Sequence, residues 1–188
     1  MWHWSQIREN VDLGEQCSIG QSCYLGPGVR IGKFVRIQNG AMIYEPAVVG
    51  DGAFIGPQVI FTNDSHPRAI TDEASTPIGS DDWTRRQVQV GKGASIGAAS
   101  VLIGPVTVGN WALIGAGSVV TRDVPAFALV VGNPARQVGW VGFAGKRLRQ
   151  ISPDTFACDE SGQTYSLEDG DLVPLRGLRS DSRSASSE

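Results

Sequence analysis

The densest group of polar side chains suited to binding or catalysis lies in residues 61–68, Phe-Thr-Asn-Asp-Ser-His-Pro-Arg. Asn63 can donate and accept hydrogen bonds, and a histidine such as His66 can transfer a proton near neutral pH. Arg68 can bind an anion such as a phosphate or a carboxylate. Pro67 restricts the preceding His66 to extended or turn conformations. These residue types predict a site for a polar, anionic substrate, although a single loop histidine is equally compatible with a purely structural role.

A six-residue repeat of large apolar residues flanks this group on both sides. Neither an amphipathic helix nor a simple alternating strand has this period, so the repeat predicts a solenoid of short strands. Three units make one triangular coil, and nine units before the interruption with six after it predict about five coils. A small or β-branched residue stands two positions earlier, and Cys17 and Cys23 fill this position as small hydrophobes. The large residues are Leu13, Ile19, Leu25, Ile31, Ile37, Ile43, Val49, Ile55 and Phe61, then Val90, Ile96, Leu102, Val108, Ile114 and Val120.

The repeat is interrupted once, where the polar group lies. The spacing from Phe61 to Val90 is not a multiple of six, so a segment of about 64–87 must leave the solenoid and return. A long loop without periodicity inside a regular fold is usually either functional or disordered. Ile70 and Trp83 give this loop apolar anchors, which favours a functional role.

Composition excludes several other classes of function. The net charge of −3 argues against binding nucleic acid or an anionic membrane by general electrostatic attraction. There is no N-terminal apolar signal segment and no apolar run of about 18 residues, so we expect a cytoplasmic protein without membrane contact. The three cysteines have no metal-ligand spacing. His3 and His66 are the only histidines, too few for a three-histidine zinc site, and we expect no metal.

A closing motif follows the second run of repeats. It comprises Gly-Ala-Gly-Ser-Val-Val-Thr-Arg-Asp-Val-Pro at 115–125 and Val-Val-Gly-Asn-Pro-Ala-Arg at 130–136. With the repeat and the loop, this motif resembles the hexapeptide-repeat acyltransferases that use acetyl-CoA, over about residues 11–140. The resemblance implies an all-β fold, a left-handed parallel β-helix with an extruded loop. It also implies acetyl-CoA as the co-substrate, with small residues at the coil corners against its pantetheine arm.

Further segments are similar to one group within that family, the nucleotide-sugar amino N-acetyltransferases. Members of this group acetylate the 3-amino group of UDP-linked diamino-glucuronates or dTDP-linked 3-amino hexoses. The resemblance implies a homotrimer whose active sites lie between neighbouring prisms, a nucleotide-sugar substrate, and a role in making surface-polysaccharide precursors such as those of O-antigen and lipopolysaccharide. The segments are Gln38-Asn39, Phe54-Ile-Gly-Pro57, Phe61-Thr-Asn63 with Pro67-Arg-Ala69, and Asn133-Pro-Ala-Arg-Gln-Val-Gly-Trp140.

The same resemblance implies roles for individual residues. Asn63 would orient the acceptor amine and His66 would be a general base. Arg136, with Lys146 or Arg147 nearby, would meet the coenzyme phosphates. The implied sites are catalytic at Asn63 and His66; substrate-binding at Gln38, Asp64 and Arg68; and cofactor-binding at Gly97, Ala98, Gly115, Ala116, Asn133, Pro134 and Arg136.

Two other functions stay open. Members of the amine-acetylating group need not carry a histidine at this loop position, whereas hydroxyl-acetylating relatives rely on one, so His66 keeps a sugar O-acetyltransferase in view. A structural solenoid without a site is the second alternative. For the domain organisation we expect an N-terminal cap at 1–10, the β-helix at 11–140 with its loop at 64–87, a C-terminal cap at 141–179 that includes a short helix, and a disordered tail at 180–188.

Overall fold

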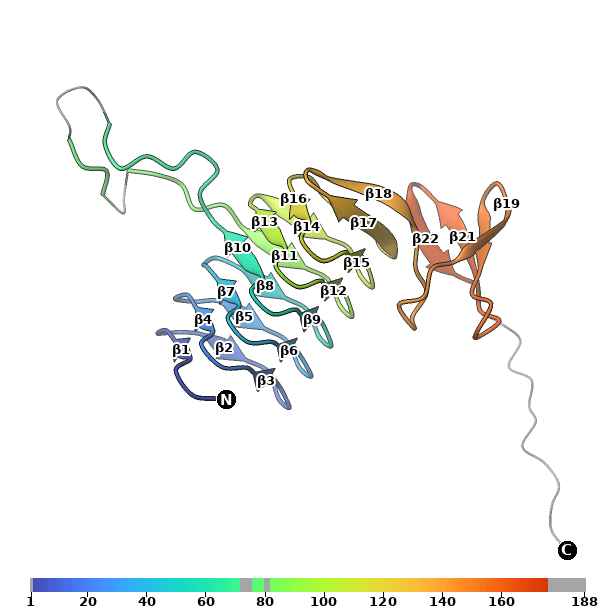
Figure 1. The fold of residues 1–188 in the computed structure, drawn as a ribbon, viewed down its shortest axis with the longest axis horizontal. Helices are drawn as coiled ribbons and strands as arrows, with labels where there is room; N and C mark the ends of the chain where they lie inside the picture. Colours follow the sequence, from blue (N-terminus) through green and yellow to red (C-terminus); the bar gives the residue numbers. More distant parts are fainter. Residues whose placement is uncertain (1, 72–75, 80–81, 176–188) are drawn as a thin grey trace, which may run out of the picture.

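The chain forms a three-sided prism of short parallel strands, followed by a small antiparallel sheet (Figure 1). The computed structural model describes residues 2–71, 76–79 and 82–175. The expected disordered tail at 180–188 and part of the 64–87 loop lie outside these residues. The fold confirms the expected all-β parallel helix.

Each side of the prism is one parallel sheet. Sheet A contains β1 (Gln6–Ile7), β4 (Tyr24–Leu25), β7 (Met42–Ile43), β10 (Ile60–Thr62), β13 (Val101–Ile103) and β16 (Val119–Val120). Sheet B contains β2 (Asp12–Leu13), β5 (Arg30–Ile31), β8 (Val48–Val49), β11 (Val88–Val90) and β14 (Val106–Val108). Sheet C contains β3 (Ser18–Ile19), β6 (Arg36–Ile37), β9 (Phe54–Ile55), β12 (Ser95–Ile96), β15 (Leu113–Ile114), β17 (Ala128–Gly132) and the antiparallel β18 (Ala135–Trp140).

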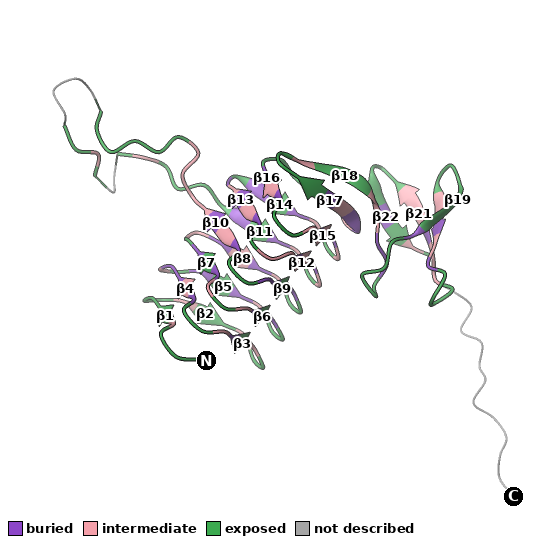
Figure 2. Cartoon of the chain, viewed as in Figure 1, coloured by how far each residue is buried: buried purple, intermediate pink, exposed green. Residues whose placement is uncertain are grey.

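The six-residue repeat forms the core of this prism. Each strand pairs in parallel with the strand one coil further on, as Tyr24 does with Met42, so residues 18 apart lie over one another. Leu25, Ile43 and Phe61 consequently stack on the inside of sheet A and are fully buried. Figure 2 shows buried residues, in purple, on successive strands of the prism. Stacking of identical positions explains why the large apolar residue recurs at a fixed interval.

Close approach between coils explains the glycine that often follows the large residue. A Cβ atom on Gly14 would lie 2.5 Å from the backbone of Gly32 in the next coil. Left-handed backbone occurs at a different position of the repeat, as at Gly28 with φ of +69°. Glycine therefore occurs at two positions of the corner for two reasons. One position lies close to the backbone of the next coil, and the other has a left-handed backbone conformation.

The prism is six parallel strands deep on sheets A and C, one more than the repeat predicts. The added strands are β1, before the first predicted repeat, and β17, after the last. β1 keeps the six-residue spacing, because Ile7 stands six residues before Leu13 and pairs with Leu25, so the repeat begins one unit earlier than predicted. β17 breaks the spacing, because Val130 pairs with Ile114 over 16 residues, so the sequence pattern does not reveal it.

The expected short helix in the C-terminal cap is wrong. Residues 141–148 form a tight turn in which Val141 bridges to Arg147, and Gly145 has φ of +70°. The cap is an antiparallel sheet of β19 (Arg149–Ser152), β20 (Thr155–Ala157), β21 (Thr164–Glu168) and β22 (Asp171–Pro174). A second apolar core, which includes Phe127, Phe156 and Tyr165, joins this sheet to the prism. No helix among the described residues is long and apolar enough to cross a membrane.

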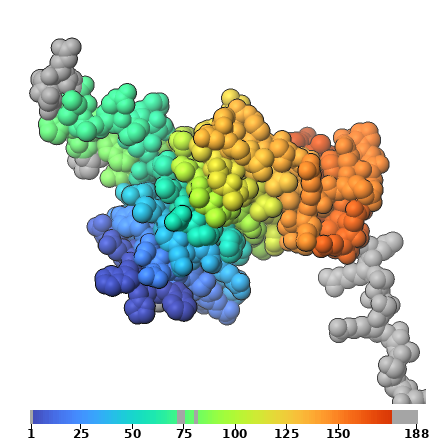
Figure 3. Space-filling model, viewed as in Figure 1, coloured from blue at the N-terminus to red at the C-terminus, as the bar shows by residue number. Residues whose placement is uncertain are grey.

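The interruption forms an arm that projects from the prism after β10 and returns at β11 (Figures 1 and 3). The backbone N–H of Arg86 donates to the Asn63 carbonyl over 2.7 Å and closes the neck of the arm. Further out, Ile70 pairs with Pro77 in an antiparallel bridge. Figure 3 shows the arm and the C-terminal sheet at opposite ends of the molecule.

Candidate active site

The residues predicted to be functional lie along two corners of the prism, on opposite edges of sheet A. We call these the A–B corner, which contains Gly26, Glu45, Asn63 and Gly104, and the C–A corner, which contains Gly20, Gln38, Gly56, Gly97 and Gly115. Asn63 and Asp64 lie on the A–B corner, whereas Gln38 lies on the C–A corner with the small residues expected to contact the coenzyme. Within one chain the structure therefore does not bring Gln38 to Asn63.

Asn63 has an oriented side chain at the root of the arm. It is half-buried, and its Nδ2 donates to the carbonyl oxygen of Glu45 over 2.8 Å. Because Nδ2 is the donor, this bond directs the amide and leaves Oδ1 as an acceptor with no hydrogen bond from the described part of the chain. The side chain can therefore accept a hydrogen bond from a bound group.

Glu45 is a neighbour of this site that the sequence interpretation missed. Its Oε1 lies 3.3 Å from Nε of Arg85, whose guanidinium in turn lies over the ring of Trp83 at 5.2 Å. Its Oε2 is buried, has no hydrogen-bond partner in the described residues, and lies against Gly26, where a side chain would collide with it. The contacts of Glu45 thus fasten the returning strand of the arm to the preceding coil. Its position 18 residues before Asn63, one full coil, was the available signal.

The remaining loop residues lie at the base of the arm. Asp64 Oδ1 accepts the backbone N–H of His66 over 2.8 Å, and the Ser65 hydroxyl donates to the carbonyl of Gly104 over 2.5 Å. The side chains of His66 and Arg68 are exposed, and within the described residues Arg68 donates only to the adjacent Pro67 carbonyl. Asp64 therefore shapes the turn, while no hydrogen bond links the His66 ring to Asn63 and the catalytic role of His66 stays a prediction.

Small residues leave the backbone of the C–A corner uncovered. Gly97 packs directly beneath Ala116, and the N–H of Gly117 donates to the Ala98 carbonyl over 2.8 Å. Ala98 is half-exposed and Ala116 is exposed. An extended chain that carries amides could lie along this corner without meeting a large side chain.

The β17–β18 hairpin continues this corner at the C-terminal end of the prism. Asn133 and Pro134 are exposed at its turn, and the N–H of Gly132 donates to the Ser118 hydroxyl over 3.2 Å. Arg136 on β18 lines a pocket of about 160 Å³ together with Arg122, which the sequence interpretation missed.

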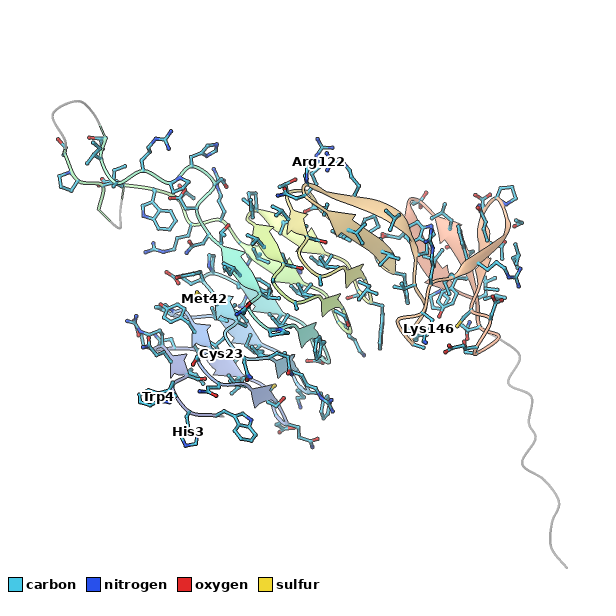
Figure 4. The ribbon with its side chains drawn as sticks, viewed as in Figure 1. His3, Trp4, Cys23, Met42, Arg122 and Lys146 are labelled. Carbon is cyan, nitrogen blue, oxygen red and sulfur yellow. The ribbon has the colours of Figure 1, made fainter. Side chains whose placement is uncertain are left out.

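The two arginines of this pocket are available to bind an anion. Neither Arg122 nor Arg136 forms an ion pair within the described residues, and both are exposed. Figure 4 shows the Arg122 side chain directed away from the ribbon. The other two expected cations are engaged elsewhere, because Lys146 pairs with Glu160 at 3.2 Å and Arg147 donates to the Val138 carbonyl at 2.7 Å. Among the described residues, no three His, Cys, Asp or Glu side chains are grouped to hold a metal ion.

Comparison with known proteins finds matches to two hexapeptide-repeat family models. The family model for bacterial transferase hexapeptide (six repeats) matches residues 28–63 and 87–122, and the hexapeptide repeat of succinyl-transferase matches residues 10–45. Together, the two hexapeptide-repeat models therefore match both runs of repeats that build the prism.

Two similar proteins are acetyltransferases by name. The chain is 45% identical over 86 residues, which are 46% of this chain and 44% of the relative, to a dTDP-3-amino-3,6-dideoxy-alpha-D-galactopyranose 3-N-acetyltransferase of Aneurinibacillus thermoaerophilus. It is 41% identical over 56 residues, 30% of this chain and 16% of the relative, to serine acetyltransferase 4 of Arabidopsis thaliana. The chain thus spans less than half the length of these curated relatives.

A solved structure supports the fold over most of the prism. A hexapeptide-repeat acetyltransferase of Vibrio cholerae, in complex with acetyl coenzyme A, superimposes with a TM-score of 0.59 and 26% identity. The match covers 70% of this chain and 71% of that chain.

Proposed function

We propose that this protein is an acetyl-CoA-dependent N-acetyltransferase that acts on the amino group of a nucleotide-linked amino sugar. The observation that carries the proposal is the oriented amide of Asn63 at the root of the arm, since it offers an acceptor to an amine N–H. Similarity to a dTDP-amino-sugar N-acetyltransferase supports the substrate class, and similarity to an acetyl-CoA complex supports the donor. A place in surface-polysaccharide precursor synthesis, in the cytoplasm, belongs to the same proposal.

The proposed enzyme is a homotrimer. Each of the two corners in one chain carries only half of the proposed site, so the other half comes from a neighbouring subunit. The two corners lie on opposite edges of sheet A, and the outer face of that sheet is apolar, with Met42 42% exposed (Figure 4). A face of this kind favours burial against another subunit. The outward residues of sheet A are Gln6 on the first strand and then Tyr24, Met42, Ile60, Val101 and Val119, against the more polar Asp12, Arg30, Val48, Gln89 and Thr107 on sheet B.

In the proposed reaction, acetyl-CoA supplies a thioester carbonyl that an amine can attack. Asn63 Oδ1 accepts one N–H of the sugar amine and so directs the nitrogen lone pair toward that carbonyl. The backbone N–H groups of Ala98 and Ala116 on the C–A corner donate to no acceptor among the described residues, so they are the candidates to stabilise negative charge on the carbonyl oxygen. The amine gives up a proton as the new C–N bond forms and the C–S bond breaks, and His66 is the candidate base on the arm.

The arginine pocket fits the other end of the coenzyme. Arg136 lies beyond Gly115 and Ala116, where the C–A corner continues into the hairpin, and Arg122 lies on the other side of the pocket, after β16 at the end of sheet A. Guanidinium groups form charge-assisted hydrogen bonds with phosphate oxygens. We assign the phosphates of acetyl-CoA to this pocket and its pantetheine arm to the small residues of the corner.

The direct test is incubation of the protein with acetyl-CoA and a panel of UDP- and dTDP-linked amino sugars, with detection by mass spectrometry. The expected result is a gain of one acetyl group on an amino sugar, and no gain on the matched sugar with a hydroxyl in place of the amine. Gain on the hydroxylated sugar alone would replace this function by O-acetyl transfer. If no acetyl group is transferred and acetyl-CoA does not bind, the alternative of a structural solenoid without an active site replaces the proposed function.

A further inference from the structure

A pocket of about 380 Å³ lies at the N-terminal end of the C–A corner, away from Asn63 and the arginine pocket. The residues that line it include Trp2, Ser18, Gln21, Gln38 and Asn39. Of these, only Gln38 is implied as a substrate contact by the family resemblance. The other four have no role in the transfer reaction described above.

The chain before the first repeat builds one wall of this pocket. The N–H of Trp2 donates to the Ile19 carbonyl over 3.1 Å, and the N–H of Ser22 donates to the His3 carbonyl over 3.2 Å. These bonds attach the backbone of Trp2 and His3 to the first coil of the prism, yet 68% of the Trp2 residue remains exposed. Its indole therefore covers no apolar core and offers a free aromatic surface.

Side-chain amides form the opposite wall. Asn39 Oδ1 accepts the N–H of Gln21 over 2.8 Å and fits against Gly20, where a Cβ atom would lie 2.5 Å from that oxygen. This bond fixes the Asn39 amide with Nδ2 available as a donor. The side-chain amides of Gln21 and Gln38 make no hydrogen bond within the described residues and can each donate and accept.

The chemistry of this pocket suits a neutral, planar ring with polar edges. No charged side chain lines it, so it offers nothing to a phosphate. An exposed indole can stack on a heteroaromatic ring, and free amides can pair with the donors and acceptors at that ring's edge. Gln38 lies two strands below Gly97 on the same corner, about 10 Å away at the usual strand spacing. The pocket is therefore separate from the part of this corner assigned to the coenzyme but within reach of a ligand bound beside it.

We propose that this pocket binds the nucleobase of the nucleotide-linked acceptor, with Trp2 as the stacking surface and Gln21, Gln38 and Asn39 as contacts to the base edge. This proposal rests on the proposed function for the identity of the ligand. Trp2, Gln21 and Asn39 are then residues that determine which nucleotide the protein accepts.

The test measures binding of dTDP and UDP to the full chain by isothermal titration calorimetry, with pyrophosphate and the free amino sugar as comparison ligands. The Trp2→Ala variant should bind the preferred nucleotide about 10-fold more weakly, and Trp2→Phe should keep most of the affinity because it keeps a ring. Gln21→Ala should weaken binding of the same nucleotide and change the ratio between dTDP and UDP. None of these variants should change the affinity for acetyl-CoA or pyrophosphate.

Trp4→Ala is the matched control, because Trp4 is 82% exposed at the same end of the prism (Figure 4) but does not line the pocket. Equal nucleotide affinity in the wild type, Trp2→Ala and Trp4→Ala would overturn the proposal. So would an effect of Trp2→Ala on the free amino sugar alone, or a wild type that binds neither nucleotide. Failure of the proposed function is a different result, because acetyl-CoA would then not bind or no acetyl group would be transferred, whatever the nucleotide affinity.

Discussion

Asn63 donates a hydrogen bond from Nδ2 to the backbone carbonyl of Glu45, across one coil of the prism, with 2.8 Å between the two atoms. The Glu45 side chain meanwhile pairs with Arg85, where the arm returns to the prism. One residue thus orients the candidate catalytic amide through its backbone and anchors the arm through its carboxylate. The position of the amide and the root of the arm are therefore linked.

Replacing Asn63 by alanine tests the role of the oriented amide. We expect Asn63→Ala to lower kcat for an amino-sugar acceptor by about 100-fold, because the amine loses the acceptor that directs it. The KM for acetyl-CoA should change little. Asn110→Ala is a suitable control, since Asn110 Oδ1 accepts a corner N–H over 2.8 Å elsewhere in the prism. Near-normal rates in Asn63→Ala on every acceptor would remove Asn63 from the site.

The arginine pocket predicts a dependence on the coenzyme phosphates. Arg122→Ala and Arg136→Ala should each weaken acetyl-CoA binding about 10-fold or more, because each removes a charge-assisted hydrogen bond. Neither substitution should affect acetyl transfer from acetyl-pantetheine, which has no phosphates. Arg30→Ala on sheet B is the control for a general loss of positive charge. Equal sensitivity with both donors would show that the arginines act on something other than the phosphates.

The repeat made the prism predictable because every large residue meets its counterpart one coil away. Leu25 and Ile43 are buried for the same reason, so one rule covers the whole core. The same rule could have found Glu45, 18 residues before Asn63. The C-terminal cap has no repeat of this kind. Its core forms where Phe143 in a turn packs against Tyr165 in a strand that is distant in sequence. The short helix predicted for the cap was therefore wrong.

The sequence also could not predict that Arg122 and Arg136 line the same pocket. Arg122 follows β16 in the solenoid, whereas Arg136 lies on β18, which reverses direction after a hairpin. Their proximity depends on where that hairpin folds back over the end of the prism. Spacing within the sequence therefore indicates the chemistry of each arginine but not that they share a pocket.

The two kinds of corner glycine predict different losses of stability. Gly14→Ala should destabilise the protein by about 1–3 kcal/mol, because its Cβ would press on the backbone of Gly32. Gly28→Ala has no atom within 4 Å of its Cβ, so it should cost only the strain of left-handed backbone, about 1 kcal/mol. Thermal melts followed by circular dichroism measure both. A larger loss for Gly28→Ala would contradict the close-approach argument.

His66 distinguishes amine from hydroxyl acetylation. An alcohol is scarcely ionised at neutral pH and needs a base more than an amine does. We therefore expect His66→Ala to lower the rate on an alcohol acceptor by about 10²–10⁴-fold but to reduce it only slightly on an amine. Initial rates on matched amino and hydroxyl sugars provide the comparison. A large loss on the amine would contradict this difference and show that N-acetylation depends on His66 as strongly as O-acetylation.

A site shared between subunits predicts that two inactive variants restore activity to each other. Asn63→Ala removes the amide on the A–B corner, and Ala116→Trp fills the small-residue path on the C–A corner, where Ala116 is exposed. In a trimer with sites between subunits, each mixed assembly has one interface with both wild-type halves. Co-refolding equal amounts of the two variants should therefore recover about a quarter of the wild-type activity by random assembly. A site within one chain would recover none, because no chain in the mixture carries both intact corners.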